Sequence, residues 1–167
     1  VGSACDAITI DIQYSAGEQQ VILNGKNVND FIRTETVSEM SSKISAIPEV
    51  REKLLSLQRS LAVAENVIMD GRDIGTHVLP NADVKIFLTA DAHVRAVRRY
   101  EEFIAKGVSC TLENVEREVI ERDERDMNRA IAPLKQAEDA VRVDTSAMTI
   151  EEVVCYLKNL IGQAVAR

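Results

Sequence analysis

The feature that most constrains the fold of this chain is a pair of uninterrupted apolar runs, each followed by polar residues. The first run lies within NVIMDGRDIG (66–75) and ends in the charged turn DGRD (70–73), and the second lies within DVKIFLTA (83–90). Short apolar runs that do not alternate with polar residues are typical of strands in parallel sheets, which helices cover on both faces. Because ligands of such sheets bind beyond the carboxyl ends of the strands, we expect the charged turn to lie at a ligand site.

The N-terminal part of the chain has a different pattern, which predicts a small antiparallel sheet over residues 5–31. AITIDIQYS (7–15) alternates apolar and polar residues with a period of two, so that one face of the strand is wet. A second strand is predicted in QQVILNG (19–25), where Asn24-Gly25 is a strong turn signal.

Two helices are predicted to follow this sheet. The first covers 34–46, with Thr34 or Thr36 as its N-cap, and the second covers 48–64, with Pro48 at its first position.

From residue 66 onward, strands and helices alternate, which predicts an α/β fold. The predicted strands are 66–70, 84–88 and 140–146. One helix is predicted at 91–107, with Asp91 as its N-cap and Gly107 at its end, and a second at 111–129, beginning at Thr111. A third helix is predicted after Thr149, where Glu152 completes a capping box.

Composition excludes several classes of function. The chain has 167 residues, of which 46% are hydrophobic, but no apolar run is long enough to span a membrane, and we see no signal peptide. The net charge of −7 disfavours general binding of nucleic acid, so an anionic ligand would need a local cluster of positive charge. The three cysteines, Cys5, Cys110 and Cys155, lack the spacing of a disulfide framework or a metal site, and we expect reduced thiols in a cytoplasmic protein.

A second charged segment, ERDERDMNRAIAP (121–133), offers such a cluster. Arg122, Arg125 and Arg129 share one face of the predicted helix, and a planar guanidinium matches the oxygens of a phosphate. Arg72 in the charged turn is expected to meet this stripe across a cleft. Two alternatives without a ligand stay open: the segment at 121–129 could be a solvated helix face with weak salt bridges, and the segment at 70–73 could be an ordinary turn with an internal ion pair.

Other candidates for chemistry are weaker. His77 and His93 have no serine or cysteine partner in a recognisable nucleophile motif, so we expect surface or hydrogen-bonded histidines. The sequence contains no G-x-x-x-x-G-K-[S/T] motif, which would hold the phosphates of a nucleotide.

Three segments, taken in order and spacing, resemble the bacterial cytidylate kinase family. They are IRTETVSEMSSKISAIPEVREKLLSLQR, DGRDIGTHVLPNADVKIFLTA and ERDERDMNRAIAPL, and the resemblance extends over essentially the whole chain. It implies a P-loop kinase-like parallel sheet with helices on both faces, incomplete at the N-terminus, and a small antiparallel insert that binds the nucleoside monophosphate. The insert would be residues 1–64 and the rest of the core residues 65–167, with an arginine-rich lid at about 117–133.

The resemblance also implies an activity in pyrimidine metabolism, the transfer of the ATP γ-phosphoryl group to CMP or dCMP with Mg²⁺. Among the matching positions, Ser42 and Arg51 would recognise the cytosine, and Arg72 and Asp73 would hold the phosphate and base side of the nucleotide. Three lid positions would close on the sugar, base and phosphate, namely Arg122, Asp126 and Arg129. Two further arginines, Arg125 and Arg98, would lie nearer the ATP phosphates, and Arg72, Arg125 and Arg98 form the expected catalytic set. No residue is assigned to bind a metal.

The chain departs from the family at its start, because it begins at the monophosphate-binding insert and lacks the P-loop lysine and hydroxyl. We therefore expect a truncated form that is inactive or nearly so by itself and that leaves apolar faces of its sheet uncovered. The alternatives are a module that binds a nucleoside monophosphate without transferring phosphate, and an acidic protein-interaction domain. CMP or dCMP and ATP are the expected partners, without nucleic acid or membrane; the sequence leaves the oligomeric state open, with a monomer as the expectation.

Overall fold

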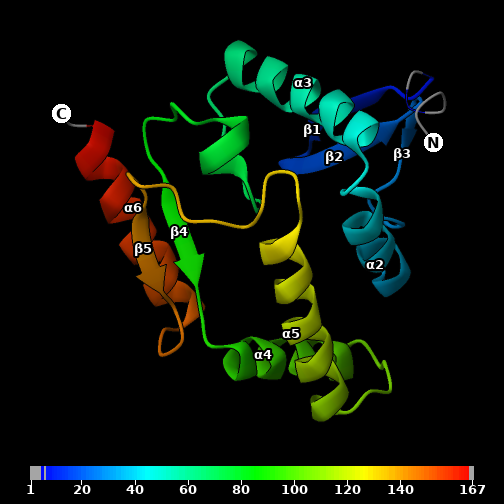
Figure 1. Ribbon diagram of the computed structural model, residues 1–167, viewed down its shortest axis with the longest axis vertical. Coiled ribbons are helices and arrows are strands. Elements are labelled where there is room, and N and C mark those ends of the chain that lie inside the picture. The colour runs from blue at the N-terminus through cyan, green and yellow to red at the C-terminus, as the bar shows by residue number, and fades with distance from the viewer. Residues whose placement is uncertain (1–4, 6, 166–167) are drawn as a thin grey trace. The chain divides into compact units, whose positions relative to one another are not determined.

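The computed structural model describes residues 5 and 7–165 and divides the chain into two compact units, Val1–Val67 and Ile68–Arg167. The elements of each unit are labelled in Figure 1. The first unit holds a three-stranded antiparallel sheet and two helices, and the second holds a two-stranded parallel sheet with the remaining helices. The predicted α/β class, with a parallel sheet and a separate small antiparallel sheet, is confirmed.

The antiparallel sheet of the first unit is built from two tight turns. β1 (Ile10–Ser15) pairs with β2 (Glu18–Leu23), which pairs with the short β3 (Lys26–Asn27). Asn24 and Gly25 both have positive φ angles, 48° and 78°, as a two-residue turn of the hairpin type requires. The predicted turn and the alternation of half-buried and exposed residues along 8–12 are confirmed.

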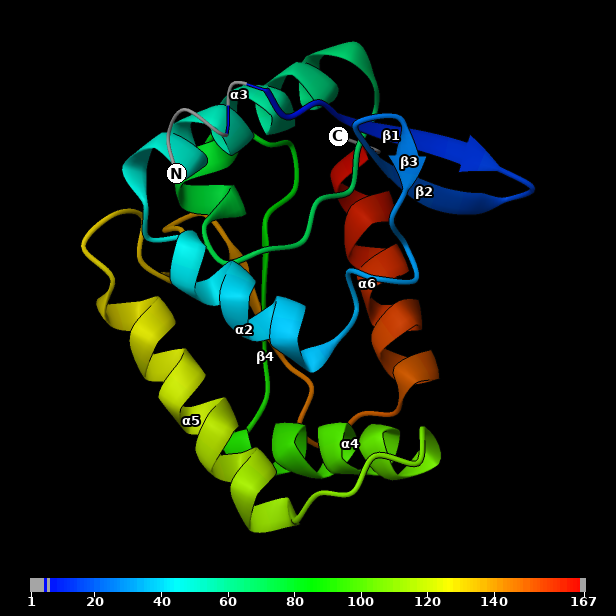
Figure 2. The same ribbon diagram turned by 90° about the vertical axis from the view of Figure 1, so that its right-hand side faces the viewer.

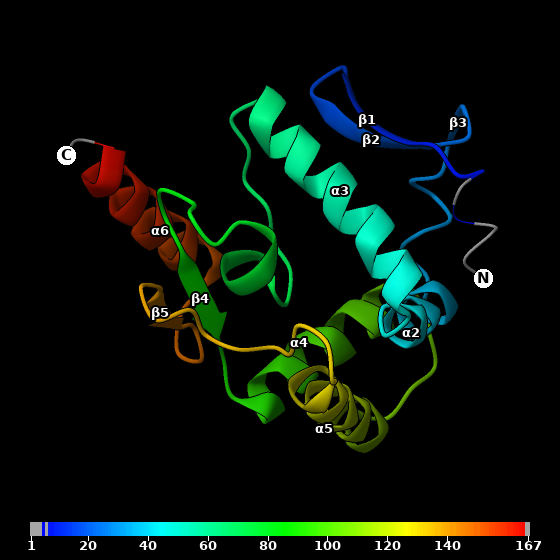
Figure 3. The same cartoon turned by 45° about the horizontal axis from the view of Figure 1, so that its top comes forward.

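Two helices follow in the first unit, joined by a short turn that is visible in Figure 3. α2 (Glu35–Ile44) is capped by Thr34, whose side-chain oxygen accepts a hydrogen bond from the Val37 amide. α3 (Pro48–Ala64) begins with proline. Proline has no amide hydrogen, and at the first position of a helix this hydrogen would have no partner within the helix. Both helices start where the sequence predicted, and the structure selects Thr34 over Thr36 as the cap.

The parallel sheet of the second unit consists of β4 (Ile86–Thr89) and β5 (Val141–Asp144), which lie side by side in Figure 1. The predicted strand at 66–70 is wrong, because these residues form no strand in the part of the chain that the structure describes. The Ile68 side chain, expected to be buried, is 94% exposed. An apolar run favours an extended backbone, but a strand forms only where a neighbouring strand supplies hydrogen bonds.

The charged turn leads into a structure that the sequence did not predict, a π-helical turn over Ile74–Val78. The Leu79 amide donates to the carbonyl of Ile74, and the Val78 amide donates to that of Asp73, so each bond spans five residues. Such turns are rare and often mark functional segments.

Three longer helices complete the second unit. They are α4 (Ala92–Ala105), capped by Asp91, α5 (Leu112–Asn128), capped by Thr111, and α6 (Ile150–Val165), preceded by the capping box of Thr149 and Glu152. All three predicted starts are confirmed. In Figures 1 and 2, α4 and α5 meet, and their contact buries Ala96, Val115 and Val119. None of the described helices is long and apolar enough to cross a bilayer.

Candidate functional site

The charged turn and the far end of α5 meet through a buried carboxylate. Arg72 Nε lies 2.9 Å from Asp126 Oδ2, and only 7% of the Asp126 side chain is exposed. The two residues are separated by 54 positions in the chain, so the fold brings them together. A buried carboxylate is stable only with a partner, and here that partner is an arginine of the predicted site.

A second ion pair joins the same two segments with the charges reversed. Arg129 Nη2 lies 3.2 Å from Asp73 Oδ1, and the side chains are 11% and 12% exposed. Arg129 Nε also donates to the carbonyl of Ala132, in the turn where Ala132 has a φ of 48°. The consecutive residues Arg72 and Asp73 therefore bind Asp126 and Arg129, which lie three apart at the end of α5.

Arg122 brings further positive charge to Asp126. Its Nε is 3.9 Å from Asp126 Oδ2. Burial and then the nearby Arg72 guanidinium lower the pKa of Arg122 below its usual value, and Asp126 opposes this shift. The positive charges of Arg99 on α4 and Arg125 on α5 lower the pKa of Arg122 further.

We call the four residues Arg72, Arg99, Arg122 and Arg125 the arginine cluster. The carboxylate of Asp126 faces two of these guanidiniums, since its Oδ2 lies 2.9 Å from Arg72 Nε and 3.9 Å from Arg122 Nε, although the whole chain carries −7. An excess of guanidiniums is the arrangement that binds the oxygens of a phosphate group.

The geometry shows how far the two structural alternatives for the charged segments apply. Arg72 pairs with Asp126 of α5, and Asp73 pairs with Arg129, the residue directly after α5, so the turn is not closed merely on an ion pair of its own. On α5, Glu121 and Glu124 are exposed, as on a solvated face, whereas Asp126 is buried and Arg129 nearly so. The helix therefore has one face in solvent and one face in contact with the charged turn.

The two residues expected to recognise cytosine lie in the first unit and are joined through Ser45. Arg51 Nη1 on α3 donates to the carbonyl of Ser45 at 3.1 Å, and Ser45 Oγ donates to the carbonyl of Ser42 on α2 at 2.8 Å. The turn between the two helices thus holds Ser42 and Arg51 near one another.

Arg98, expected near the ATP phosphates, lies at the loop after β5. Its guanidinium donates to Oγ1 and the carbonyl of Thr145 and to the carbonyl of Met148. Thr145 is buried and in turn bonds to Thr89 at the end of β4. Arg98 therefore binds at the carboxyl ends of both parallel strands, and the structure does not place it in the arginine cluster.

Sequence reasoning missed one ionic contact that bears on the site, between Arg95 of α4 and Asp123 of α5. Their nitrogen and oxygen atoms pair at 3.0 and 2.6 Å. The partners are 28 residues apart on separate helices, so no local spacing signals the pair.

The remaining sequence expectations concern histidines, cysteines and metals. His93 is exposed and its Nδ1 lies 3.0 Å from Glu116 Oε2, and His77 is exposed, so both are the surface histidines that we expected. The three cysteines are free. Within residues 5 and 7–165, no three or more His, Cys, Asp or Glu side chains are grouped so that they could hold a metal ion.

Comparison with known proteins identifies the chain's relatives. The family model described as cytidylate kinase matches residues 3–163. A cytidylate kinase of Carboxydothermus hydrogenoformans is 52% identical over 155 residues, which cover 92% of this chain and 70% of that protein. Cytidylate kinases of Lactobacillus johnsonii and Pasteurella multocida are 47% and 44% identical, over 93% and 98% of this chain and 68% and 73% of theirs.

Proposed function

The chain belongs to the cytidylate kinase family, a family of phosphotransferases, and from this premise we propose that it acts on CMP or dCMP with ATP as the phosphoryl donor. The observation that carries the proposal is the arginine cluster around the buried Asp126. Phosphoryl transfer demands little covalent chemistry from a protein; it demands that the reacting groups be positioned and their negative charge neutralised.

Each charged residue of the site has a proposed part. Arg72 and Arg129 bind the phosphate of the monophosphate, and Arg122 with Asp126 closes on its sugar, where the carboxylate accepts hydrogen bonds from hydroxyl groups. Asp73 holds Arg129 in place and contacts the base side of the nucleotide.

Recognition of the base is proposed for the first unit. Cytosine offers an amine donor and ring acceptors, which a serine hydroxyl and a guanidinium complement. Ser42 and Arg51, linked through Ser45, supply these groups.

The ATP phosphates are proposed to interact with Arg125 and Arg98. We propose that Mg²⁺ enters on the phosphate oxygens of ATP. It would neutralise charge on the transferred group.

A specific observation favours a second candidate, binding of a nucleoside monophosphate without transfer. The 167 residues contain no G-x-x-x-x-G-K-[S/T] motif, whose backbone and lysine hold ATP phosphates in P-loop enzymes. A chain that retains the arginine cluster but has no such loop would bind CMP and turn over no ATP.

The test uses thermal unfolding and turnover on the same preparation of the 167-residue chain. CMP at 100 times its Kd should stabilise the folded state by about 2.7 kcal/mol, and UMP should do so less. Release of ADP that depends on CMP supports the kinase, and stabilisation without ADP release supports the binding module. If no nucleotide raises the unfolding temperature, both candidates fail and the interaction domain is favoured.

A further inference from the structure

One ionic contact outside the proposed substrate contacts ties the helix of the arginine cluster to the end of a sheet strand. Arg95 Nη1 and Nη2 pair with Asp123 Oδ1 and Oδ2 at 3.0 and 2.6 Å. Arg95 Nε donates to the carbonyl of Ala90 at 3.0 Å. Ala90 is buried and directly follows β4, so the contact joins α5 to the strand end through α4.

The geometry of this contact fixes direction as well as distance. All three guanidinium nitrogens are engaged, two with the same carboxylate and one with a backbone oxygen. Two parallel hydrogen bonds between planar groups resist rotation of either group, and an ammonium group cannot reproduce them. The side chains are 35% and 27% exposed, so solvent screens the pair only in part.

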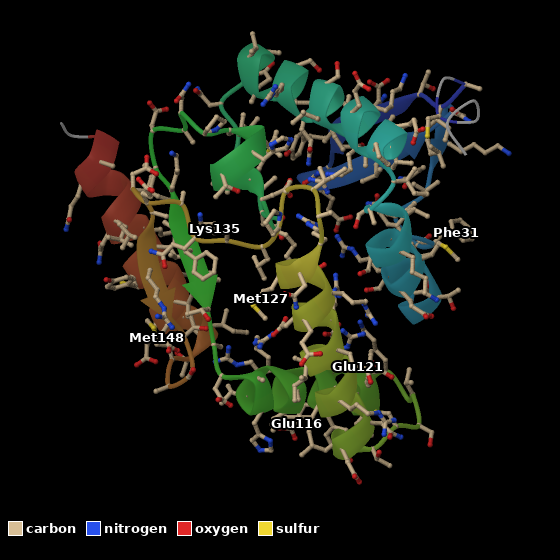
Figure 4. All side chains as sticks on the ribbon, viewed as in Figure 1. Phe31, Glu116, Glu121, Met127, Lys135 and Met148 are labelled. Atoms are coloured by element: carbon tan, nitrogen blue, oxygen red, sulfur yellow. The ribbon has the colours of Figure 1, made fainter. Side chains whose placement is uncertain are left out.

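The second half of α5 depends on such polar contacts. The buried apolar contacts with α4 involve Val115 and Val119, in the first half of the helix. Beyond them, Ile120 and Met127 are 42% and 51% exposed. Figure 4 marks the course of the helix by Glu116, Glu121 and Met127. Among the described residues, the pair Arg72–Asp126 joins this half to the charged turn, and the pair Arg95–Asp123 joins it to α4.

We infer that Arg95 and Asp123 are positioning residues of the arginine cluster, which set where the guanidiniums of α5 lie relative to the end of β4. The inference rests on the proposed function, because the affinity that the pair controls is that of the proposed CMP site. Asp123 adjoins Arg122 and precedes Asp126 by three residues, so a shift of this helical turn displaces both groups. Displacement of binding groups by about 1 Å is enough to lower their effectiveness by up to about 100-fold.

Simple electrostatics predicts the opposite result for one variant, which makes the inference testable. Asp123→Asn removes a negative charge beside the arginine cluster, and by Coulomb's law alone it should tighten the binding of an anion. If Asp123 acts by positioning, the same change weakens binding. Glu124→Gln is the matched control, because Glu124 is the next residue of the same helix, carries the same charge and is exposed.

The experiment measures CMP affinity of the full chain by titration calorimetry, at a temperature where every variant is folded by circular dichroism. We expect Asp123→Asn and Arg95→Lys each to raise the Kd about tenfold, whereas Glu124→Gln and Arg117→Lys leave it unchanged or lower it. Arg117 is an exposed arginine of the same helix, so its lysine variant controls for the loss of a guanidinium. The double variant should be no weaker than the worse single variant, since both changes break one contact.

The outcomes separate this inference from the proposed function. If the wild-type chain binds CMP and Asp123→Asn binds it equally or more tightly, the positioning inference is overturned while the CMP site stands. If the wild type binds no CMP, the proposed function fails. The positioning role of Arg95 and Asp123 is then tested by the rate of amide hydrogen exchange in residues 120–128. Faster exchange in Asp123→Asn than in Glu124→Gln would support positioning, and equal exchange would overturn it.

Discussion

At the scale of single residues, the carboxylate of Asp126 is the group on which the site depends most. It is buried, accepts a hydrogen bond from Arg72 and lies near Arg122. Its negative charge offsets the repulsion between the Arg72 and Arg122 guanidiniums. In addition to this structural role, the same carboxylate is proposed to bind a sugar hydroxyl.

Asp126→Asn should lower the free energy of unfolding by about 2 kcal/mol. The amide keeps the volume but loses the charge, which leaves the Arg72 and Arg122 guanidiniums without their countercharge. Urea denaturation measures the change, and exposed Glu124→Gln should alter stability by no more than about 0.5 kcal/mol. Equal stability of the two variants would contradict this account of the cluster.

The acid titration of Asp144 should depend on Ser146. The Ser146 hydroxyl and then its amide donate to Asp144 Oδ1 at 2.6 and 2.9 Å, and these bonds lower the pKa of Asp144 below its usual 3.8. The stability that Asp144 contributes is therefore present above pH 3.8 and is lost as the pH falls through its lower folded-state pKa.

Ser146→Ala should raise the pKa of Asp144 toward its usual value, because the first of these hydrogen bonds is lost. An NMR titration of the carboxyl groups measures the pKa of Asp144. Asp139 is the internal control, since its pKa is lowered by its hydrogen bond with Lys85 and should not move. If the pKa values of Asp144 and Asp139 both changed, Ser146→Ala would be acting on the whole second unit.

At the scale of elements, helix ends account for much of what local sequence specifies. The end of α4 is closed by Gly107, whose φ is 73°, and by bonds from the Gly107 and Val108 amides to the carbonyls of Ile104 and Phe103. This is the pattern in which a glycine in left-handed conformation satisfies the last carbonyls of a helix. This helix end sets the direction in which the chain leaves α4 toward α5, which carries Arg122 and Arg125 of the arginine cluster.

Two glycine substitutions should have opposite effects. Gly107→Ala should destabilise the chain by about 1 kcal/mol, because a Cβ disfavours positive φ. Gly162→Ala, within α6, should stabilise it by about 0.5–1 kcal/mol, because nothing lies within 4 Å of the added Cβ and alanine favours the helix. Thermal unfolding of both variants measures the contrast, and the same sign for both would refute it.

At the scale of the whole molecule, the residues proposed to recognise the base and those proposed to bind the phosphate belong to different units. Ser42 and Arg51 lie in the first unit, and the arginine cluster lies in the second. A base-recognition group and a phosphate-binding group on separate units predict that the two kinds of binding can be weakened separately.

Ser42→Ala should weaken CMP binding about fivefold, the worth of one hydrogen bond, and should leave the binding of inorganic pyrophosphate unchanged. Arg72→Met should weaken the binding of both ligands, because Arg72 is proposed to bind the phosphate that the two have in common. Ser41→Ala is the control on the same helix, since the Ser41 hydroxyl donates to the carbonyl of Ser38. Calorimetric titration with the two ligands tests this, and an equal loss of both in Ser42→Ala would count against a base-recognition role.

The local structure follows from short stretches of sequence. Capping residues, the Asn24-Gly25 turn and the helical periodicity place nearly every helix start and the first-unit hairpin, because each depends on groups within a few residues. The stripe of Arg122, Arg125 and Arg129 is also local, since helical spacing alone puts these residues on one face. The resemblance to cytidylate kinases, read from three motifs, was confirmed by comparison.

Which charged side chains meet depends on the packing of distant segments. The pairing of Arg72 with Asp126, of Asp73 with Arg129 and of Arg95 with Asp123 joins residues 28 to 56 positions apart, and composition cannot choose among the many carboxylates available. The strand predicted at 66–70 failed for the same reason, because an apolar run becomes a strand only if a neighbouring strand supplies its hydrogen bonds. Local preferences are properties of the sequence, whereas pairing between distant residues is a property of the packed chain.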